Sequence, residues 1–253
     1  MRISARLALA AVTASICMTG AVSQAAPKAK AKVVRPAAAP APTPSEAVKQ
    51  VAEWVIASGD NREMPFAIVD KVMANVFVFD VKGEPRGASA VLLGFARGDE
   101  PTPGVGDRQL SSIKPEERTT PAGRFLTAYG PANGAARVLW VDYATAISMH
   151  PVPSGNPKEQ RIKRLRSASA EDNRITYGCI NVSAAFYEKV VRRTFKGPGG
   201  VVYVLPEEKS LAEALPAFRP VQRASNEAVE DGLDSTPSAE GGLSDNAQLS
   251  LAR

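Results

Sequence analysis

Histidine and cysteine are almost absent from this chain of 253 residues. His150 is the only imidazole, and apart from Cys17 near the N-terminus, Cys179 is the only thiol. A zinc site would need at least one acidic ligand beside this pair, and no acidic residues stand at a recognisable spacing. The residue types therefore give little support for a metal site. A chain without Cys17 can form no internal disulfide, so its single thiol is a candidate reactive group.

Aromatic residues are also scarce, at 6% of the chain. The net charge is +5 and the isoelectric point about 9.3, but the charge is uneven. Residues 1–36 carry six basic residues and no acidic one, whereas residues 205–253 carry nine acidic and four basic residues. There is no basic stripe interleaved with aromatics, so nucleic acid is not a predicted partner.

A long apolar run is missing as well. The start of the chain has basic residues at Arg2 and Arg6, a small-apolar run from Leu7 to Met18, and Ser23-Gln-Ala25, which fits a small-x-small cleavage pattern. The run is too short to span a bilayer comfortably. We expect residues 1–25 to be a secretory signal peptide, leaving no stable membrane span after cleavage. The mature protein would then be periplasmic or held in the cell envelope.

Two low-complexity stretches flank the expected domain. Residues 26–42 are rich in Ala, Pro and Lys and are typical of a linker. Residues 206–253 form an acidic, largely disordered tail by composition, with a short helix possible around residues 209–215.

Residues 43–64 should form an N-terminal helix and a lead-in to the domain. Thr43, Pro44 and Glu46 offer a capping box in which Thr43 is the N-cap, and apolar residues then recur at helical spacing. Gly59 should end this helix.

From Pro65 the apolar pattern changes to period two or to short apolar runs, and both favour strands. A second helix is expected over residues 183–195, after Cys179. The remaining stretch from 136 to 150 reads as one long strand or a hairpin. We therefore predict a mainly β domain over residues 65–205, with strands at 66–70, 75–81, 88–96, 124–129 and 200–205.

Cys179 lies in the stretch ITYGCINV, residues 175–182. Gly178 permits a tight turn and a close approach of substrate. Ser183 can cap the following helix, which would place the thiol near a helix N-terminus and lower its pKa. The amides of Gly178 and Cys179 are natural oxyanion donors.

His150 could serve as the general base for this thiol. No Asp or Asn side chain is evident as a third group, but a backbone carbonyl near His150 could orient the ring. Residue types alone also allow plainer interpretations, in which Cys179 is a buried small hydrophobe and His150 a satisfied structural residue.

Two motifs are similar to those of the L,D-transpeptidases, the YkuD-type family that remodels peptidoglycan. Residues 120–125, TPAGRF, resemble the family's Thr-Pro-x-Gly-x-Phe strand entry. His150 with residues 176–181, TYGCIN, resembles its His … Ser/Thr-His-Gly-Cys-hydrophobic-Asn motif. The resemblance spans about residues 65–205 and implies a β-sandwich with the site on one face.

The resemblance implies that Cys179 attacks the L-to-D peptide bond of a tetrapeptide stem of peptidoglycan, with His150 as base, through a thioester intermediate. It implies that Gly178 and Cys179 stabilise the oxyanion and that Asn181 supports the site. Peptidoglycan stem peptides are the implied partner, and no metal or cofactor is implied. Hydrolysis by an L,D-carboxypeptidase and a non-catalytic wall-binding module are the alternatives.

The chain departs from the family pattern in two places. Tyr177 stands where the motif has a second histidine, and Cys179 is 29 positions after His150, a longer gap than usual. The extra length is the polar, basic stretch of residues 154–174, which is either a solvated loop or a lid whose arginines bind stem-peptide carboxylates. Arg174 and Thr176 are the predicted substrate contacts in the second case.

Overall fold

The N-terminal helix begins later than its sequence predicts. The structure is a computed structural model, and it describes residues 41–132, 136–197 and 199–221. Helix α1 (Glu46–Ser58) has Ser45, not Thr43, as its N-cap, because the Ser45 hydroxyl accepts the Val48 N–H at 3.3 Å. Gly59 ends the helix in a left-handed conformation, φ +68°, as predicted.

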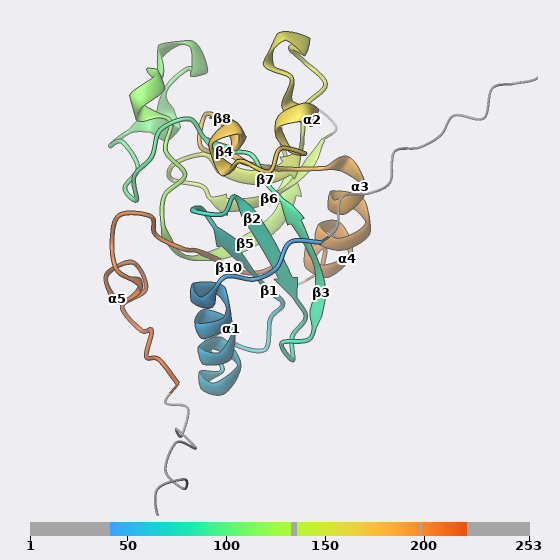
Figure 1. Cartoon of the computed structure of the whole chain (residues 1–253), viewed down its shortest axis with the longest axis vertical. Helices are drawn as coiled ribbons and strands as arrows, with labels where there is room; N and C mark the ends of the chain where they lie inside the picture. The colour runs from blue at the N-terminus through green and yellow to red at the C-terminus, as the bar shows by residue number, and fades with distance from the viewer. Residues whose placement is uncertain (1–40, 133–135, 198, 222–253) are drawn as a thin grey trace, which may run out of the picture. The chain divides into compact units, whose positions relative to one another are not determined.

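Eight strands form one sheet in the order β3-β2-β1-β10-β5-β6-β7-β9, with a separate parallel pair β4-β8 (Figure 1). β1 pairs in parallel with β10 and β7 with β9, while the other neighbours in the large sheet are antiparallel. The strand bounds are β1 (Phe66–Asp70), β2 (Asn75–Phe79), β3 (Pro85–Ala90), β4 (Leu93–Gly94), β5 (Gly123–Pro131), β6 (Arg137–Asp142), β7 (Ile147–Pro151), β8 (Arg174–Thr176), β9 (Ile180–Val182) and β10 (Gly200–Val204).

The strand predicted over residues 88–96 is divided in two. β3 ends at Ala90 and the chain turns so that Leu92 bridges Asn181 through two backbone hydrogen bonds of 2.8 and 2.9 Å. This bridge joins the chain just after β3 to β9, the two ends of the sheet order, so the sheet is nearly closed. The stretch 136–150 is a hairpin, not one strand, and Ala146 takes φ +56° in its turn.

Period-two alternation sorts the side chains of the half-sheet β3-β2-β1-β10 into two cores. On β1, Ala67 and Val69 face a core shared with the half-sheet β5-β6-β7-β9, whereas Phe66 and Ile68 face α1. The two half-sheets thus face each other across the first core as a sandwich, and α1 covers the outer side of one of them (Figure 1). The predicted mainly β fold with an N-terminal helix is confirmed.

A continuous helical segment follows the cysteine, as predicted. It comprises α3 (Ala184–Phe186), a π-helical turn (Tyr187–Val191) and α4 (Arg192–Phe195). Ser183 is its N-cap, and its hydroxyl accepts the Phe186 N–H at 3.2 Å. The segment inserts Tyr187, Val191 and Phe195 into the first core.

The remaining helices are short. They are α2 (Arg161–Arg164), α5 (Leu211–Ala214) and the 3₁₀ turns Val105–Asp107, Leu110–Ser112, Pro115–Glu117, Pro157–Glu159 and Ala170–Asn173. Within the described ranges, no helix combines the length and the apolar character needed to cross a membrane.

The folded domain continues beyond residue 205, the predicted end. Leu215 and Phe218 are buried with α1 in the second core, and the Phe218 ring lies edge-on to Trp54 with centroids 5.6 Å apart. The first part of the predicted tail, up to residue 221, therefore belongs to the domain. The predicted signal peptide (1–25), nearly all of the linker (26–40 of 26–42) and the rest of the tail (222–253) lie outside the described residues.

Candidate active site

Strands β7 and β9 bring the thiol and the imidazole to one face of the sheet. They pair in parallel, with Met149 opposite Ile180 and His150 opposite Asn181. Met149 and Ile180 point into the core with no exposed surface. Because side chains alternate along a strand, His150 and Asn181 point to the opposite face, and Cys179 approaches from the residue just before β9.

The Cys179 thiol is half-buried beside the start of β7. Its Sγ lies 3.8 Å from the hydroxyl of Ser148 and 3.8 Å from the Ala146 carbonyl. Ser148 is two residues before His150 on the same strand, so it shares the face of the site.

His150 is held at both ring nitrogens. Nδ1 lies 2.8 Å from the Pro151 carbonyl and Nε2 lies 3.0 Å from Asn181 Nδ2. A carbonyl can only accept, so Nδ1 carries a proton that it donates to Pro151. The expectation that a backbone carbonyl near His150 orients the ring is thus met by Pro151.

The two groups shift each other's proton affinity. Burial acts to raise the pKa of the Cys179 thiol, but His150 and Ser148 outweigh it and the pKa lies below its usual 9.0. Burial acts to lower the pKa of His150, but Cys179 and the Pro151 carbonyl outweigh it and the pKa lies above its usual 6.5. Both shifts bring the two proton affinities closer together and so ease transfer of the thiol proton to the imidazole, which produces the reactive thiolate.

The turn before Cys179 is fixed by two threonines. The Thr176 hydroxyl donates to the Cys179 carbonyl at 2.7 Å and accepts the Gly178 N–H at 3.1 Å. The Thr120 hydroxyl, from the TPAGRF motif, donates to the Gly178 carbonyl at 2.8 Å and accepts the Gly94 N–H at 2.9 Å. Thr176, with only 2% exposed surface, therefore holds the turn, and this position does not support its predicted contact with substrate.

Glycine is the only residue type that fits at position 178 of this turn. Its φ is +120°, and an added Cβ would lie 2.5 Å from Ile147 Cδ1 and 2.7 Å from the Thr119 carbonyl oxygen. Since its N–H already donates to Thr176, Gly178 is not a free oxyanion donor in this geometry, contrary to the sequence-based expectation.

The predicted helix N-terminus at the thiol is wrong. The three residues of β9 stand between Cys179 and the N-cap Ser183. The influence of a helix dipole is confined to about its first turn, so the His150 and Ser148 contacts, and not the helix, account for the lowered thiol pKa.

Tyr177 is half-buried, and the Arg118 guanidinium lies 3.9 Å above its ring centroid. At that distance a guanidinium and an aromatic face attract each other. The tyrosine therefore connects the Cys179 turn to the segment that leads into β5.

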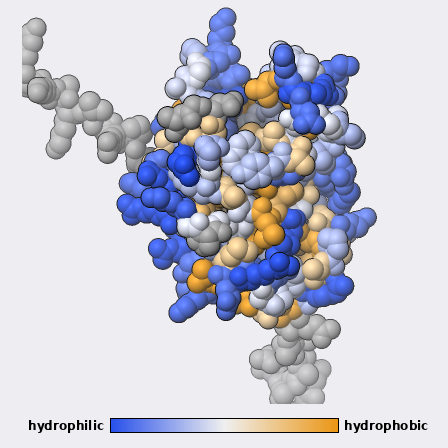
Figure 2. All heavy atoms as spheres, turned by 180° about the vertical axis from the view of Figure 1, so that it is seen from behind, coloured by the Kyte–Doolittle hydropathy of each residue, from blue (hydrophilic) through white to orange (hydrophobic). Residues whose placement is uncertain are grey.

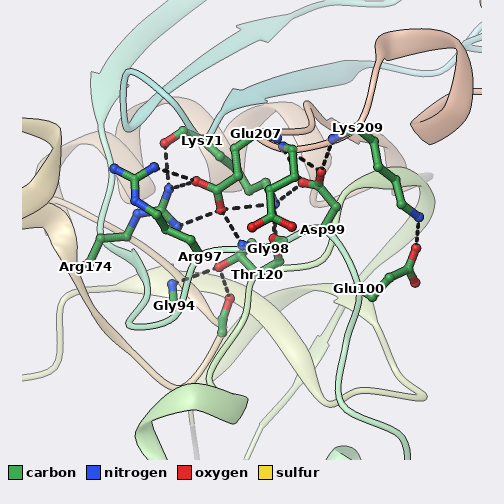
Figure 3. Close-up of polar contacts among 12 residues, drawn as sticks. Lys71, Gly94, Arg97, Gly98, Asp99, Glu100, Thr120, Arg174, Glu207 and Lys209 are labelled. Atoms are coloured by element: carbon green, nitrogen blue, oxygen red, sulfur yellow. Dashed lines mark hydrogen bonds and ion pairs between the residues drawn. The ribbon is translucent and has the colours of Figure 1, made fainter.

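Arg174 lies in a buried ion cluster (Figure 3). Its guanidinium is bound to Glu207 and donates to the Lys71 carbonyl at 3.1 Å, and only 7% of the residue is exposed. A guanidinium whose donors are used in this way does not support the predicted binding of a stem-peptide carboxylate.

The same cluster anchors the chain after β10. The Lys71 ammonium, with no exposed surface, donates to Asp99 at 2.7 Å and to the Gly98 and Thr120 carbonyls. Asp99 also accepts the backbone N–H groups of Glu207, Glu208 and Lys209 (Figure 3). Because the Thr120 hydroxyl also donates to the Gly178 carbonyl, the cluster is linked to the turn that carries Cys179.

The basic stretch contributes a different arginine to the site. Arg161 Nη1 donates to Asn181 Oδ1 at 2.8 Å, and its Nε is paired with Glu159. Sequence reasoning missed both Arg161 and Ser148. Ser148 could have been found from its i−2 spacing to His150 on one strand, whereas nothing in the sequence separates Arg161 from the other basic residues around it.

A pocket of about 660 Å³ has His150, but not Cys179, among its lining residues. Its walls come from β5, β6, the chain after β7 and the helical segment. Charged and aromatic side chains at this pocket are Tyr129, Arg137, Tyr187, Glu188 and Arg192. Among the described residues, no group of three or more His, Cys, Asp or Glu side chains is placed to hold a metal ion.

No protein-family model matches this sequence, and no curated protein matches it. Solved structures of a helical cell shape determining protein and of L,D-transpeptidases are similar to part of this chain. The helical cell shape determining protein Pgp2 from Campylobacter jejuni is 17% identical, with 62% of this chain and 54% of that chain covered and a TM-score of 0.39. An L,D-transpeptidase from Mycobacterium smegmatis is 14% identical, with 56% and 58% covered and a TM-score of 0.31. The L,D-transpeptidase from Xylanimonas cellulosilytica is 14% identical, with 56% and 60% covered and a TM-score of 0.33.

This chain thus matches little more than half the length of those proteins. At these identities and TM-scores, the likeness carries no activity, substrate or residue role over to it. Within the described residues, the fold and the site define a β-rich protein whose one imidazole lies on β7 and whose one thiol lies just before the neighbouring parallel strand β9.

Proposed function

We propose that this protein is an exported cysteine acyltransferase of the L,D-transpeptidase type that acts on tetrapeptide stems of peptidoglycan. The observation that carries the proposal is the shared face of β7 and β9. It joins the only histidine of the chain to Cys179, beside a glycine turn held by the two sequence motifs that resemble the family. A purely structural cysteine would have no need of an imidazole oriented by a carbonyl and an amide.

In the proposed acylation, Cys179 Sγ attacks the carbonyl carbon of the L-to-D peptide bond. Nδ1 of His150 is protonated and faces Pro151, so the thiol proton goes to Nε2. The tetrahedral oxygen is bound by the Cys179 N–H, since the Gly178 N–H is in use. The carbon–nitrogen bond then breaks, D-alanine leaves with the proton from Nε2, and a thioester remains on Cys179.

The second half is the reverse with a new nucleophile. An amine of another stem gives a proton to Nε2 and attacks the thioester carbon. The carbon–sulfur bond breaks, Cys179 leaves as a thiolate that takes the proton back, and a new amide bond forms. The 660 Å³ pocket that His150 lines offers room for a peptide chain beside the base.

Product analysis tests this function. The mature protein is incubated with a tetrapeptide muropeptide, and the products and intact protein are weighed by mass spectrometry. We expect cross-linked dimers and an acyl adduct on Cys179, and neither product with Cys179→Ala. Tripeptide without dimer would instead establish an L,D-carboxypeptidase. Unchanged muropeptide that still binds Cys179→Ala as tightly as the parent would establish a non-catalytic wall-binding module.

A further inference from the structure

Arg161 reaches the site from the basic stretch between β7 and β8. It begins α2, and its side chain is 13% exposed although four of the five residues from Lys158 to Ile162 are charged or polar. Its Nη1 donates to Asn181 Oδ1 at 2.8 Å, and Asn181 itself has 1% exposed surface. A buried amide bonded to a charged donor on one side is held in one orientation.

The hydrogen bonds that link Arg161, Asn181 and His150 are consistent with only one assignment of donors and acceptors. Arginine can only donate, so the Asn181 atom that faces Arg161 is the oxygen and the atom that faces His150 is the nitrogen. The amide nitrogen can only donate, so His150 Nε2 accepts. Since Nδ1 donates to the Pro151 carbonyl, the imidazole is neutral, with its proton on Nδ1.

We propose that Arg161 is a positioning residue that acts through Asn181 to hold His150 as the neutral Nδ1–H tautomer in the resting site. The inference rests on the proposed function and deepens it. It gives Arg161, in the unusual basic stretch, control over the protonation of His150, the base in that reaction. The Asn181 amide occupies the same Nε2 lone pair that must take the thiol proton.

Formation of the imidazolium therefore requires a rearrangement. When the proton of Cys179 moves to Nε2, the new N–H faces the Asn181 NH₂ group, and two donors repel. The contact becomes favourable only if the amide turns over and offers its oxygen, which breaks the bond to Arg161. Arg161 thus opposes charging of His150 both by this bond and by its own positive charge.

Other charged and titratable groups near His150 do not substitute for Arg161. Cys179 acts in the opposite direction, because its thiolate favours the imidazolium. Glu159 is engaged by Arg161 itself. The pocket that His150 lines also has Arg137, Tyr129, Tyr187 and an ion pair between Glu188 and Arg192 in its walls.

The single histidine makes the test direct. His150 is titrated by NMR through its ring carbon-bound protons, and its tautomer is read from the ring nitrogen shifts, in a Cys179→Ser background that removes the thiolate. With Arg161→Met, which keeps the length of the side chain but not its charge or donors, we expect the pKa to rise by about one unit. The pure Nδ1–H tautomer should give way to a mixture.

Two variants control for charge and for folding. Lys163→Ala removes a cation from the same helix that has no contact with Asn181 or His150 among the described residues, and should leave the pKa and the tautomer unchanged. Arg161→Lys keeps a charge and a donor and should restore much of the parent behaviour. Should Arg161→Met not fold, Arg161→Gln is expected to raise the pKa in the same direction.

Equal pKa values and equal tautomer shifts in Arg161→Met and Lys163→Ala would overturn the proposal. Loosening of the loop alone would broaden resonances without exchanging the tautomer. Because the titration needs no substrate, it can succeed when the muropeptide assay fails, and the two proposals are judged separately.

Discussion

At Gly178 a positive φ coincides with a lack of space, because an added Cβ would lie within 2.7 Å of Ile147 and of Thr119. Gly178→Ala should lower the free energy of unfolding by about 2 kcal/mol or more, from left-handed backbone strain and overpacking together. Urea unfolding measures this. Gly155→Ala is the matched control, since an added Cβ there meets nothing within 4 Å and should change stability by less than about 0.5 kcal/mol. Equal midpoints for the two variants would contradict the steric argument.

The lowered pKa of Cys179 predicts a pH profile for thiol modification. Iodoacetamide alkylation is followed in a Cys17→Ser chain, so that one thiol reacts. His150→Ala removes the main partner of the thiolate and leaves burial to raise the pKa, so the midpoint should move to higher pH. The rate at pH 7 should fall about tenfold, because each pKa unit changes the thiolate fraction tenfold. An unmoved midpoint would mean that His150 does not stabilise the thiolate.

At the scale of single residues, the sequence predicts which residue types belong to the candidate site. It does not predict which partners their hydrogen-bonding groups have. The pairing of Cys179 with His150 remains a prediction about chemistry, although both lie on one face of the sheet. The geometry does not support the predicted oxyanion role of Gly178 or the predicted substrate role of Arg174, for one reason. Each group already has a partner that is distant in sequence or fixed by a turn, and only the folded chain reveals it.

The buried ion cluster makes the stability of the elements that it joins depend on pH. Burial opposes ionisation of Asp99, but Lys71 and three backbone N–H groups outweigh it, and the pKa falls from 3.8 to about 2. A carboxyl with a lowered folded-state pKa stabilises the fold above its unfolded value, and this stability is lost as pH falls through the folded value. We therefore expect about 2 kcal/mol of stability from this group to disappear between about pH 4 and pH 2.

Asp99→Asn tests the cluster at neutral pH. It leaves the Lys71 ammonium buried with only Glu207, 3.5 Å away, as a charged partner, so stability at pH 7 should fall by about 3 kcal/mol. The acid-dependent loss between pH 4 and pH 2 should shrink at the same time. Chemical unfolding at several pH values measures both. A variant that is destabilised at pH 7 but loses stability in acid as steeply as the parent would assign the acid response to another group.

Strand positions were predicted better than strand ends. Period-two patterns or short apolar runs located β1, β2, β5 and β10, because these strands lie against buried surfaces that their own sequence reflects. The division of β3 from β4 depends on Leu92 pairing with Asn181, nearly ninety residues away, and no local pattern encodes it. The N-cap at Ser45 has a similar cause, since its hydroxyl also donates to Asp70 at 2.6 Å.

Over the whole described molecule, two closures complete the domain, each a contact between segments that are far apart in the sequence. The Leu92–Asn181 bridge joins the ends of the large sheet beside the candidate site. Figure 2 shows hydrophilic side chains around the rim of the back face and a band of apolar surface across its middle. The second closure brings the chain after β10 onto α1, and composition did not predict it because short apolar groups in an acidic stretch resemble a disordered tail.

Phe218 tests that second closure. Its ring is 6% exposed and packs on Trp54, which in turn lies edge-on to Tyr203 of β10, so one contact chain joins the two ends of the described domain to the sheet. Phe218→Ala should therefore cost about 3 kcal/mol of unfolding free energy. Val221→Ala, at a side chain 43% exposed, should cost less than about 0.5 kcal/mol. Calorimetry measures the unfolding free energy of the two variants. Because Phe218 touches no residue of the candidate site, the alkylation rate of Cys179 in the folded state should be unchanged. A lowered alkylation rate in folded Phe218→Ala would instead mean that the ion cluster transmits the packing of this segment to the cysteine turn.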